Sequence, residues 1–182
     1  MKPLFILRII PPMDKNFFVA VMNSPIGKLI LASDKISLVG VWFEGQKYID
    51  KKILNNAILK DNLDVFDDTK LWLKDYFRGI KVQANDLPIA PIGSEFRQLV
   101  WRELCKIPYG ELSTYGKIAK EIARQKSISK MSAQAVGSAV GHNPIAIIIP
   151  CHRVVASNGN LTGYAGGLEK KIKLLELEVC NK

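Results

Sequence analysis

Short apolar runs separated by turn residues dominate the first half of the chain. Three of these runs, at residues 17–22, 28–32 and 38–43, are rich in β-branched and aromatic side chains, which favours strands. Ser-Pro-Ile-Gly at 24–27 and Ser-Asp-Lys at 33–35 are turn sequences between consecutive runs. The pattern therefore predicts a small antiparallel sheet built from hairpins.

A helical period follows these runs, at about residues 69–78. Either Asp67 or Asp68 is placed to cap the start of this helix, and Gly79 is placed to end it. One face of the helix would be apolar and would cover the sheet. That face is formed by Leu73, Tyr76, Phe77 and Ile80.

The second half of the chain shows helical periods in place of strand patterns. Apolar residues recur at helical spacing at about 96–104, 115–122, 132–140 and 168–180. Ser113 or Thr114 would cap the second of these helices. Two helices followed by a short third one, in a basic region, suggest a helix-turn-helix that binds DNA.

The short helix predicted at 132–140 has two unlike faces. Val136, Ala139 and Val140 would face the core, whereas the opposite face is nearly smooth. A smooth face can approach DNA closely but has few donors for base edges, which favours binding with low sequence specificity. A tightly packed internal helix would have the same composition. The smooth face is formed by Ala133, Gln134, Gly137, Ser138 and Gly141.

The last predicted helix, at 168–180, carries an apolar stripe that we expect to pack inward. The stripe consists of Leu168, Ile172, Leu175 and Val179. Glu178 borders the stripe, either as a carboxylate that orients an imidazole or as a solvated acid at the helix end. Three lysines of the same helix would lie on its solvated side, with contact to phosphates as the alternative, namely Lys170, Lys171 and Lys173.

A segment without periodicity divides the chain. Residues 86–93 contain two prolines, which favours a boundary within an α+β protein. We expect an N-terminal α/β subdomain at 15–87, a linker at 88–93 and a helical domain at 94–182. Residues 1–14 would form a leader, either poorly ordered or adding a strand, because their apolar run is too short to span a membrane and lacks a cleavage pattern.

The composition of the chain indicates what kind of partner, compartment and metal content to expect. The net charge is +9, and residues 91–182 hold 13 basic against 7 acidic side chains, which favours a polyanionic partner. Cys105, Cys151 and Cys180 are too few for a disulfide framework, so we expect a reducing, cytoplasmic compartment. No cysteine and histidine cluster has the spacing of zinc ligands, so we expect no metal.

Cys151 and His152 are the strongest candidates for chemistry. The apolar residues 147–149 before Pro150 predict a central strand that ends at the cysteine, beside a pocket. A thiol becomes a nucleophile when a nearby base favours the thiolate. Neighbouring side chains of a strand point to opposite faces, so either the chain turns sharply here or a water carries the proton. A buried, inert cysteine beside a hydrogen-bonded histidine would give the same pair.

Four motifs surround this pair in a fixed order between residues 90 and 180. They are Pro-Tyr-Gly-Glu at 108–111, Gly-His-Asn-Pro at 141–144, Pro-Cys-His-Arg-Val-Val at 150–155 and Gly-Tyr-Ala-Gly-Gly at 163–167. In these motifs the chain resembles the O6-alkylguanine-DNA alkyltransferases, also called methylated-DNA-protein-cysteine methyltransferases. The resemblance implies an α+β fold, with a ribonuclease H-like sheet and helix first. A winged-helix-like helix-turn-helix domain that carries the active-site cysteine would follow.

The resemblance also implies roles for individual residues. Cys151 would be the nucleophile, His152 would take its proton through a water, and Glu178 would hold the imidazole. Asn143 would brace the turn before the active-site segment. Tyr115 would stand beside the flipped nucleotide and protonate the leaving guanine. Because ordinary thiol chemistry does not reverse the thioether product, each molecule would act once and without a cofactor.

Further residues would hold the base and the DNA. Backbone carbonyls of Cys151 and Val154 and the N–H of Ala165 would bind the guanine, and Tyr164 would wall the pocket. Gln134 stands where the family usually has an arginine that replaces the flipped base. Since glutamine lacks charge and stacks less well, we expect flipping with weaker DNA binding. The remaining residues expected at the DNA or pocket are Ala133, Gly137, Ser138 and Arg153.

The function implied is DNA repair, in which an alkyl group moves from O6-alkylguanine in DNA to Cys151, with O4-alkylthymine as a further candidate substrate. The partner would be double-stranded DNA, bound in the minor groove by a monomer with the damaged base flipped out. A protein that only flags alkyl lesions is an alternative, but such proteins replace the nucleophile, and Cys151 is intact. A thiol hydrolase would have no use for the helix-turn-helix, and a methylation-controlled transcription sensor would need a further domain.

Overall fold

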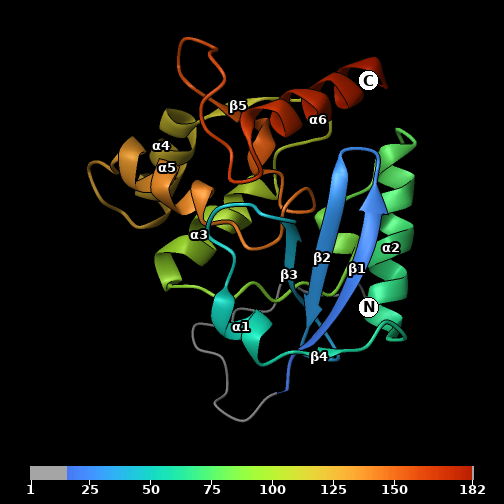
Figure 1. Ribbon diagram of the computed structural model, residues 1–182. Helices are drawn as coiled ribbons and strands as arrows, with labels where there is room; N and C mark the ends of the chain where they lie inside the picture. The colour runs from blue at the N-terminus through green and yellow to red at the C-terminus, as the bar shows by residue number, and fades with distance from the viewer. Residues whose placement is uncertain (1–15, 182) are drawn as a thin grey trace.

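The computed structural model of the chain describes residues 16–181. It is an α+β structure in which a sheet and a long helix form the first half and four helices the second (Figure 1). The leader predicted at 1–14 lies outside the described residues. Within the described part of the chain, no helix combines the length and apolar character needed to cross a membrane.

The first half contains a four-stranded sheet in the order β3-β2-β1-β4. Its strands are β1 (Phe18–Ser24), β2 (Gly27–Ser33), β3 (Leu38–Phe43) and β4 (Ile58–Leu59). The three predicted strands and their antiparallel pairing are confirmed, whereas β4 was not predicted and runs parallel to β1. All side chains of β3 are buried, so this strand lies at the centre of the molecule.

Helix α2 (Asp64–Phe77) packs against β1, β2 and β3 and lies along one side of the sheet in Figure 1. The prediction of a start at residue 69 with an aspartate cap is wrong, because the N-cap is Leu63 and no side chain caps it. Leu63, Val65 and Phe66 are buried, so core packing holds the first turn. Two one-turn pieces escaped prediction, α1 (Lys51–Asn55) and the 3₁₀ helix η1 (Ala84–Asp86).

The second half is built on α3 (Glu95–Leu104), α4 (Tyr115–Gln125) and α5 (Ala133–Gly141), which pack on one another. Side-chain oxygens of Ser94, Thr114 and Ser132 cap the three helices by accepting from backbone N–H groups in the first turn. Val136, Ala139 and Val140 of α5 are buried, as predicted from the pattern.

The C-terminal helix α6 (Leu168–Cys180) has the predicted bounds but buries a different face, adjacent to the predicted one. Its buried residues are Lys171, Leu174 and Glu178. The stripe that we expected to pack inward is largely open to solvent, with Val179 66% and Leu168 45% exposed. Hydrophobicity alone gave the wrong face because the buried lysine and glutamate of this helix are satisfied by hydrogen bonds.

The two halves share one core. Main-chain bonds join β3 to the segment after α5, from Val41 N–H to the Pro144 carbonyl at 2.9 Å and from Ala146 N–H to the Val41 carbonyl at 2.9 Å. The proposed linker is buried as well, because Ile89 pairs with Leu38 and is 1% exposed. The division into two domains at 88–93 stays a prediction.

Candidate active site

The chain turns sharply before Cys151. The central strand predicted at 147–149 is wrong, since these residues form turns and Ile147 has a φ of 70°. Cys151 then opens a 3₁₀ helix, η2 (Cys151–Arg153), which leads into the short strand β6 (Val154–Val155). The apolar run is buried without being a strand, a case that hydrophobicity cannot distinguish. Cys151 and His152 therefore do not follow the alternation of side chains along a strand.

Asn143 holds this turn. Its side-chain N–H groups donate to the carbonyls of Ile145 and Ile149, at 3.2 and 2.8 Å, and its Oδ1 accepts from the Ile145 N–H at 3.0 Å. The same Nδ2 lies 3.1 Å from Sγ of Cys151. Asn143 therefore fixes the backbone around the cysteine and also donates to its sulfur, which favours the thiolate.

Glu178 is the centre of a buried polar cluster behind the cysteine. Its Oε1 lies 2.8 Å from Nε2 of His152, and its two oxygens accept from Nε and Nη2 of Arg153 at 2.9 to 3.2 Å. The main-chain N–H of Gly110 donates to Oε2 at 3.0 Å. Since the carboxylate accepts at Nε2, the His152 proton is on that nitrogen. Nδ1 is then the acceptor, and it has no hydrogen-bond partner within residues 16–181.

Burial sets the ionisation of these groups. Burial raises the pKa of the Cys151 thiol, and the Asn143 amide and the Lys171 ammonium oppose that rise. Burial lowers the pKa of His152, so the imidazole is kept neutral, although Glu178 opposes the shift. Burial alone would raise the pKa of Glu178, but the hydrogen bonds from His152 and Arg153 outweigh it and bring the pKa to about 2. The site thus holds a thiol, a neutral base and a charged carboxylate.

Cys151 lies at the wall of a small cavity between α5 and the loop at 163–167. The volume of the cavity is only about 30 Å³, which is too small for a purine base. Its lining residues are Gln46, Tyr115, Gly137, Val140, Gly141, Asn143, Ala146, Cys151, Gly163, Tyr164, Ala165 and Gly166. The loop at 163–167 therefore leaves little space over the cysteine.

Three predicted site residues come together at this cavity. Short strands β5 (Ser113–Thr114) and β6 pair in parallel, which brings Tyr115, the next residue, to the site. The Tyr115 hydroxyl lies 2.7 Å from Oγ1 of Thr162. Tyr164 stands beside the Cys151 sulfur, and burial first and that sulfur second raise the pKa of its hydroxyl. Ala165 is tied to the N-terminal half, since its carbonyl accepts from the Lys47 N–H at 3.1 Å.

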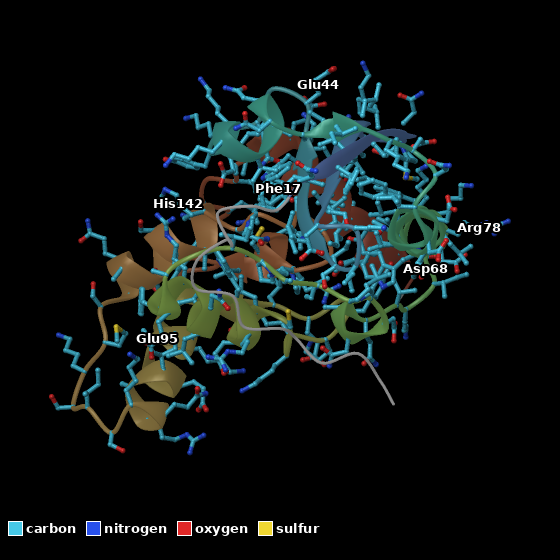
Figure 2. The ribbon with its side chains drawn as sticks, turned by 90° about the horizontal axis from the view of Figure 1, so that it is seen from below. Phe17, Glu44, Asp68, Arg78, Glu95 and His142 are labelled. Carbon is cyan, nitrogen blue, oxygen red and sulfur yellow. The ribbon has the colours of Figure 1, made fainter. Side chains whose placement is uncertain are left out.

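The residues expected to contact DNA are divided between surface and interior. Ala133, Gln134 and Ser138 are exposed on α5, and Gly137 is half-buried against Tyr115. At the end of this helix lies His142, which is labelled in Figure 2. Its ring stacks on Tyr48 with ring centroids 4.2 Å apart.

Arg153 does not reach the surface. It is 6% exposed, and its guanidinium binds Glu178 and the Ile107 carbonyl, the latter at 2.6 Å from Nη1. The expectation that Arg153 contacts DNA is therefore wrong. Val154 is also buried, and its carbonyl already accepts from Nζ of Lys171 at 2.7 Å, although a carbonyl has a second lone pair.

Two residues of the site were missed in the sequence. The Tyr76 hydroxyl of α2 donates to Glu178 Oε1 at 2.8 Å, and Lys171 of α6 is fully buried with its ammonium on the Val154 and Thr162 carbonyls. Tyr76 has the pattern of an ordinary core aromatic. Lys171 looks like an ordinary solvated lysine in the sequence. The one signal for its burial is its spacing, since it lies one helical turn before Leu174 and two turns before Glu178. Residues 16–181 contain no group of His, Cys, Asp or Glu arranged to hold a metal ion.

Two family models match nearly the whole described chain. The ribonuclease-like domain of 6-O-methylguanine DNA methyltransferase matches residues 18–91, and the DNA binding domain of the same family matches residues 95–180. The chain belongs to the 6-O-methylguanine DNA methyltransferase family, which confirms the resemblance seen in the motifs.

Individual relatives agree. A methylated-DNA–protein-cysteine methyltransferase of Methanosarcina acetivorans is 43% identical over 166 residues, covering 88% of this chain and 97% of that protein. One of Haemophilus influenzae is 42% identical, covering 85% of this chain and 82% of that protein. The crystal structure of Mycobacterium tuberculosis O6-methylguanine methyltransferase superimposes with a TM-score of 0.77 at 38% identity, covering 91% of this chain and 94% of that chain. A second crystal structure, of OGT from the same organism in complex with DNA, has a TM-score of 0.77 at 37% identity over the same shares of the two chains. The predicted α+β fold is confirmed.

Proposed function

We propose that this protein repairs DNA by moving an alkyl group from O6 of guanine to Cys151, with O4-alkylthymine as a further substrate. The observation that carries the proposal is the Cys151 thiol at the wall of a cavity, with an amide donor on its sulfur. The adjacent residue adds a neutral imidazole whose Nδ1 has no partner within residues 16–181. Family membership and relatives named for this reaction support it.

The chemistry is a single displacement. The thiol proton passes through a water to Nδ1 of His152, which Glu178 keeps oriented through Nε2. The sulfur then attacks the alkyl carbon in line, so that the S–C bond forms while the C–O6 bond breaks and the electron pair stays on guanine. The Tyr115 hydroxyl, which is hydrogen-bonded to the Thr162 hydroxyl in this structure, gives a proton to guanine N3. The thioether remains, so one protein molecule repairs one base.

Binding to DNA is the second part of the proposal. The exposed small residues of α5 form a smooth face that fits a minor groove, and the net charge of +9 favours a phosphate backbone. A related protein has been crystallised with DNA. The damaged base would be flipped out of the stack, with exposed Gln134 filling the gap. We propose that a monomer does this in the cytoplasm.

A flipped base requires the active-site loop to open. A cavity of about 30 Å³ cannot hold a purine, so residues 163–167 move away from Cys151 before guanine enters. During this motion the hydrogen bond from the Lys47 N–H to the Ala165 carbonyl either breaks or stays intact while Lys47 moves with the loop. Once the base is in place, Tyr164 and the Ala165 N–H would close on it.

Intact-mass spectrometry tests the proposal directly. The protein is mixed with excess duplex DNA containing one O6-methylguanine, with Cys151→Ala in parallel and undamaged DNA as a control. We expect a gain of one methyl group per molecule, mapped to Cys151 and absent from the variant. Retained DNA binding without any mass gain would instead identify a protein that flags lesions.

A further inference from the structure

The N-terminal half of the molecule reaches into the polar cluster behind Cys151 through one side chain. Tyr76 of α2 is fully buried, and its hydroxyl donates to Glu178 Oε1 at 2.8 Å while lying 3.3 Å from Nε2 of His152. His152 binds the same carboxylate oxygen at 2.8 Å. Tyr76 and His152 are therefore two donors on one acceptor atom, one from each half of the chain.

We propose that Tyr76 is a positioning residue for alkyl transfer, which sets how firmly Glu178 holds His152 and thereby couples the N-terminal half to the reaction. The inference rests on the function proposed above. Tyr76 touches neither the base nor the sulfur, and it acts only through the carboxylate and the imidazole.

The hydroxyl, not the ring, carries the argument. The ring of Tyr76 stacks on Trp72 with centroids 5.7 Å apart and meets Tyr109 edge to face at 5.8 Å, contacts that phenylalanine would make equally well. A buried hydroxyl is costly unless it is bonded, and here its one strong bond is to the carboxylate that orients His152. Tyr109, in the same cluster, has a buried hydroxyl without a partner in the described part of the chain.

The effect on His152 has a definite sign. By donating to Oε1, the Tyr76 hydroxyl takes up part of the negative charge of Glu178, so the carboxylate stabilises an imidazolium less. The neutral imidazole, with Nδ1 as acceptor, is the form that can receive the thiol proton. Without the hydroxyl, Glu178 would favour the charged imidazole, and His152 would stay protonated to higher pH. The groups that act on His152 are Tyr76 of α2, Glu178 and Lys171 of α6 and Arg153 of η2.

The test compares Tyr76→Phe with Tyr109→Phe, two changes that each remove one hydroxyl from the same aromatic cluster. Single-turnover methyl transfer at saturating DNA is measured from pH 5.5 to 9, together with the DNA dissociation constant. For Tyr76→Phe we expect a rate about tenfold lower on the acidic side of the profile, because a rise of one pKa unit in His152 leaves about a tenth as much neutral imidazole there. We also expect its acidic limb to move to higher pH, with unchanged DNA affinity. Tyr109→Phe should match the wild type.

Nuclear magnetic resonance of the two histidines gives a readout that does not depend on transfer. With His142→Gln to assign the signals, the pKa of His152 should rise in Tyr76→Phe and stay unchanged in Tyr109→Phe. Replacing Tyr76 by 3-fluorotyrosine keeps the hydroxyl and changes the ring by one small fluorine. Because the hydroxyl becomes a stronger donor, the pKa of His152 should fall.

The possible failures are distinct. If wild type and Tyr109→Phe transfer no methyl group, the proposed function fails. If they transfer but Tyr76→Phe has the wild-type rate, acidic limb and His152 titration, Tyr76 is a packing residue and the inference is overturned. A rate lowered only in proportion to the folded fraction overturns it as well.

Discussion

At the scale of single residues, Lys171 departs most from its expected place. It was expected to face solvent, yet it is fully buried, and its ammonium donates to the Val154 carbonyl at 2.7 Å and to the Thr162 carbonyl at 3.2 Å. It thus ties the segment after Cys151 to the loop that covers the cavity. Burial lowers the pKa of Lys171, while Lys171 in turn opposes the rise in the pKa of the Cys151 thiol.

Lys171→Met should therefore weaken both the fold and the thiolate. Two carbonyls lose their donor, which should cost about 1–3 kcal/mol of unfolding free energy in urea. The pKa of Cys151 should rise, because a nearby positive charge is gone, and iodoacetamide labelling of Cys151 followed by mass spectrometry should shift to higher pH. Lys173→Met is the control, since Lys173 is exposed and its ion pair within residues 16–181 is with exposed Glu169. Equal labelling profiles for the two variants would contradict the electrostatic role.

The sequence suffices for residues whose partners are close along the chain. Asn143, Cys151 and His152 lie within ten positions, so a turn brings them together, and the motifs fix their order. Glu178 could be predicted as a site residue only from its place at the border of the apolar stripe and from the family resemblance. Tyr76 could not be named, because its partner is 102 positions away and its spacing is that of any core residue. Arg153 was misplaced, since an arginine is normally a surface residue and nothing local reveals a buried carboxylate.

At the scale of elements, the active-site loop at 163–167 packs on β3 through a glycine. A Cβ at Gly166 would lie 2.6 Å from Cδ2 of Phe43, a fully buried ring that has no room to withdraw. A Cβ at Gly163 would meet nothing within 4 Å. The two glycines therefore differ in steric freedom within one loop.

Gly166→Ala should displace the loop and with it Tyr164, at a cost of about 1–3 kcal/mol for overpacking. Since Tyr164 and Ala165 would close on the base, we expect single-turnover transfer to slow by about tenfold or more. Binding to undamaged DNA should persist, because α5 is untouched. Gly163→Ala is the matched control, because it adds the same methyl group to the loop without a clash, and it should slow transfer less than Gly166→Ala does. Equal rates for both variants would mean that the closed loop has no part in transfer.

Helices α3 to α5, each with one apolar and one polar face, follow the period of their hydrophobic residues, and the three main strands follow their runs of β-branched and aromatic residues. The hydrophobic pattern gave a wrong strand at 147–149. This buried apolar run is folded into turns, and the Asn143 side chain donates hydrogen bonds to backbone carbonyls of the segment. The pattern also predicted the wrong buried face of α6, because that face carries a lysine and a glutamate whose charged groups are hydrogen-bonded. Both failures lie beside Cys151, where chemistry requires buried polar groups.

At the scale of the whole molecule, one core runs through both halves of the chain. The main cluster of buried side chains extends from Ala20 of β1 to Leu174 of α6. Strand β3 bonds to the segment before Cys151, and α2 reaches Glu178 through Tyr76. The two halves match separate family models, yet residues 88–93 between them are packed against β3. A cooperative fold follows from this packing in spite of the two-part sequence.

The three tryptophans of the chain allow this to be measured. Trp42 and Trp72 lie in the first half and Trp101 in the second, and each is at most 6% exposed. Variants that keep one tryptophan, with phenylalanine at the other two positions, report the unfolding of each half in urea by fluorescence. The urea midpoint from circular dichroism serves as the reference for the stability of each variant. We expect the fluorescence midpoint to coincide with that reference in all three variants. A Trp101 signal that persists after the signals of Trp42 and Trp72 are lost would show that the second half folds alone. In that case Tyr76 could not be an obligatory link to the active site.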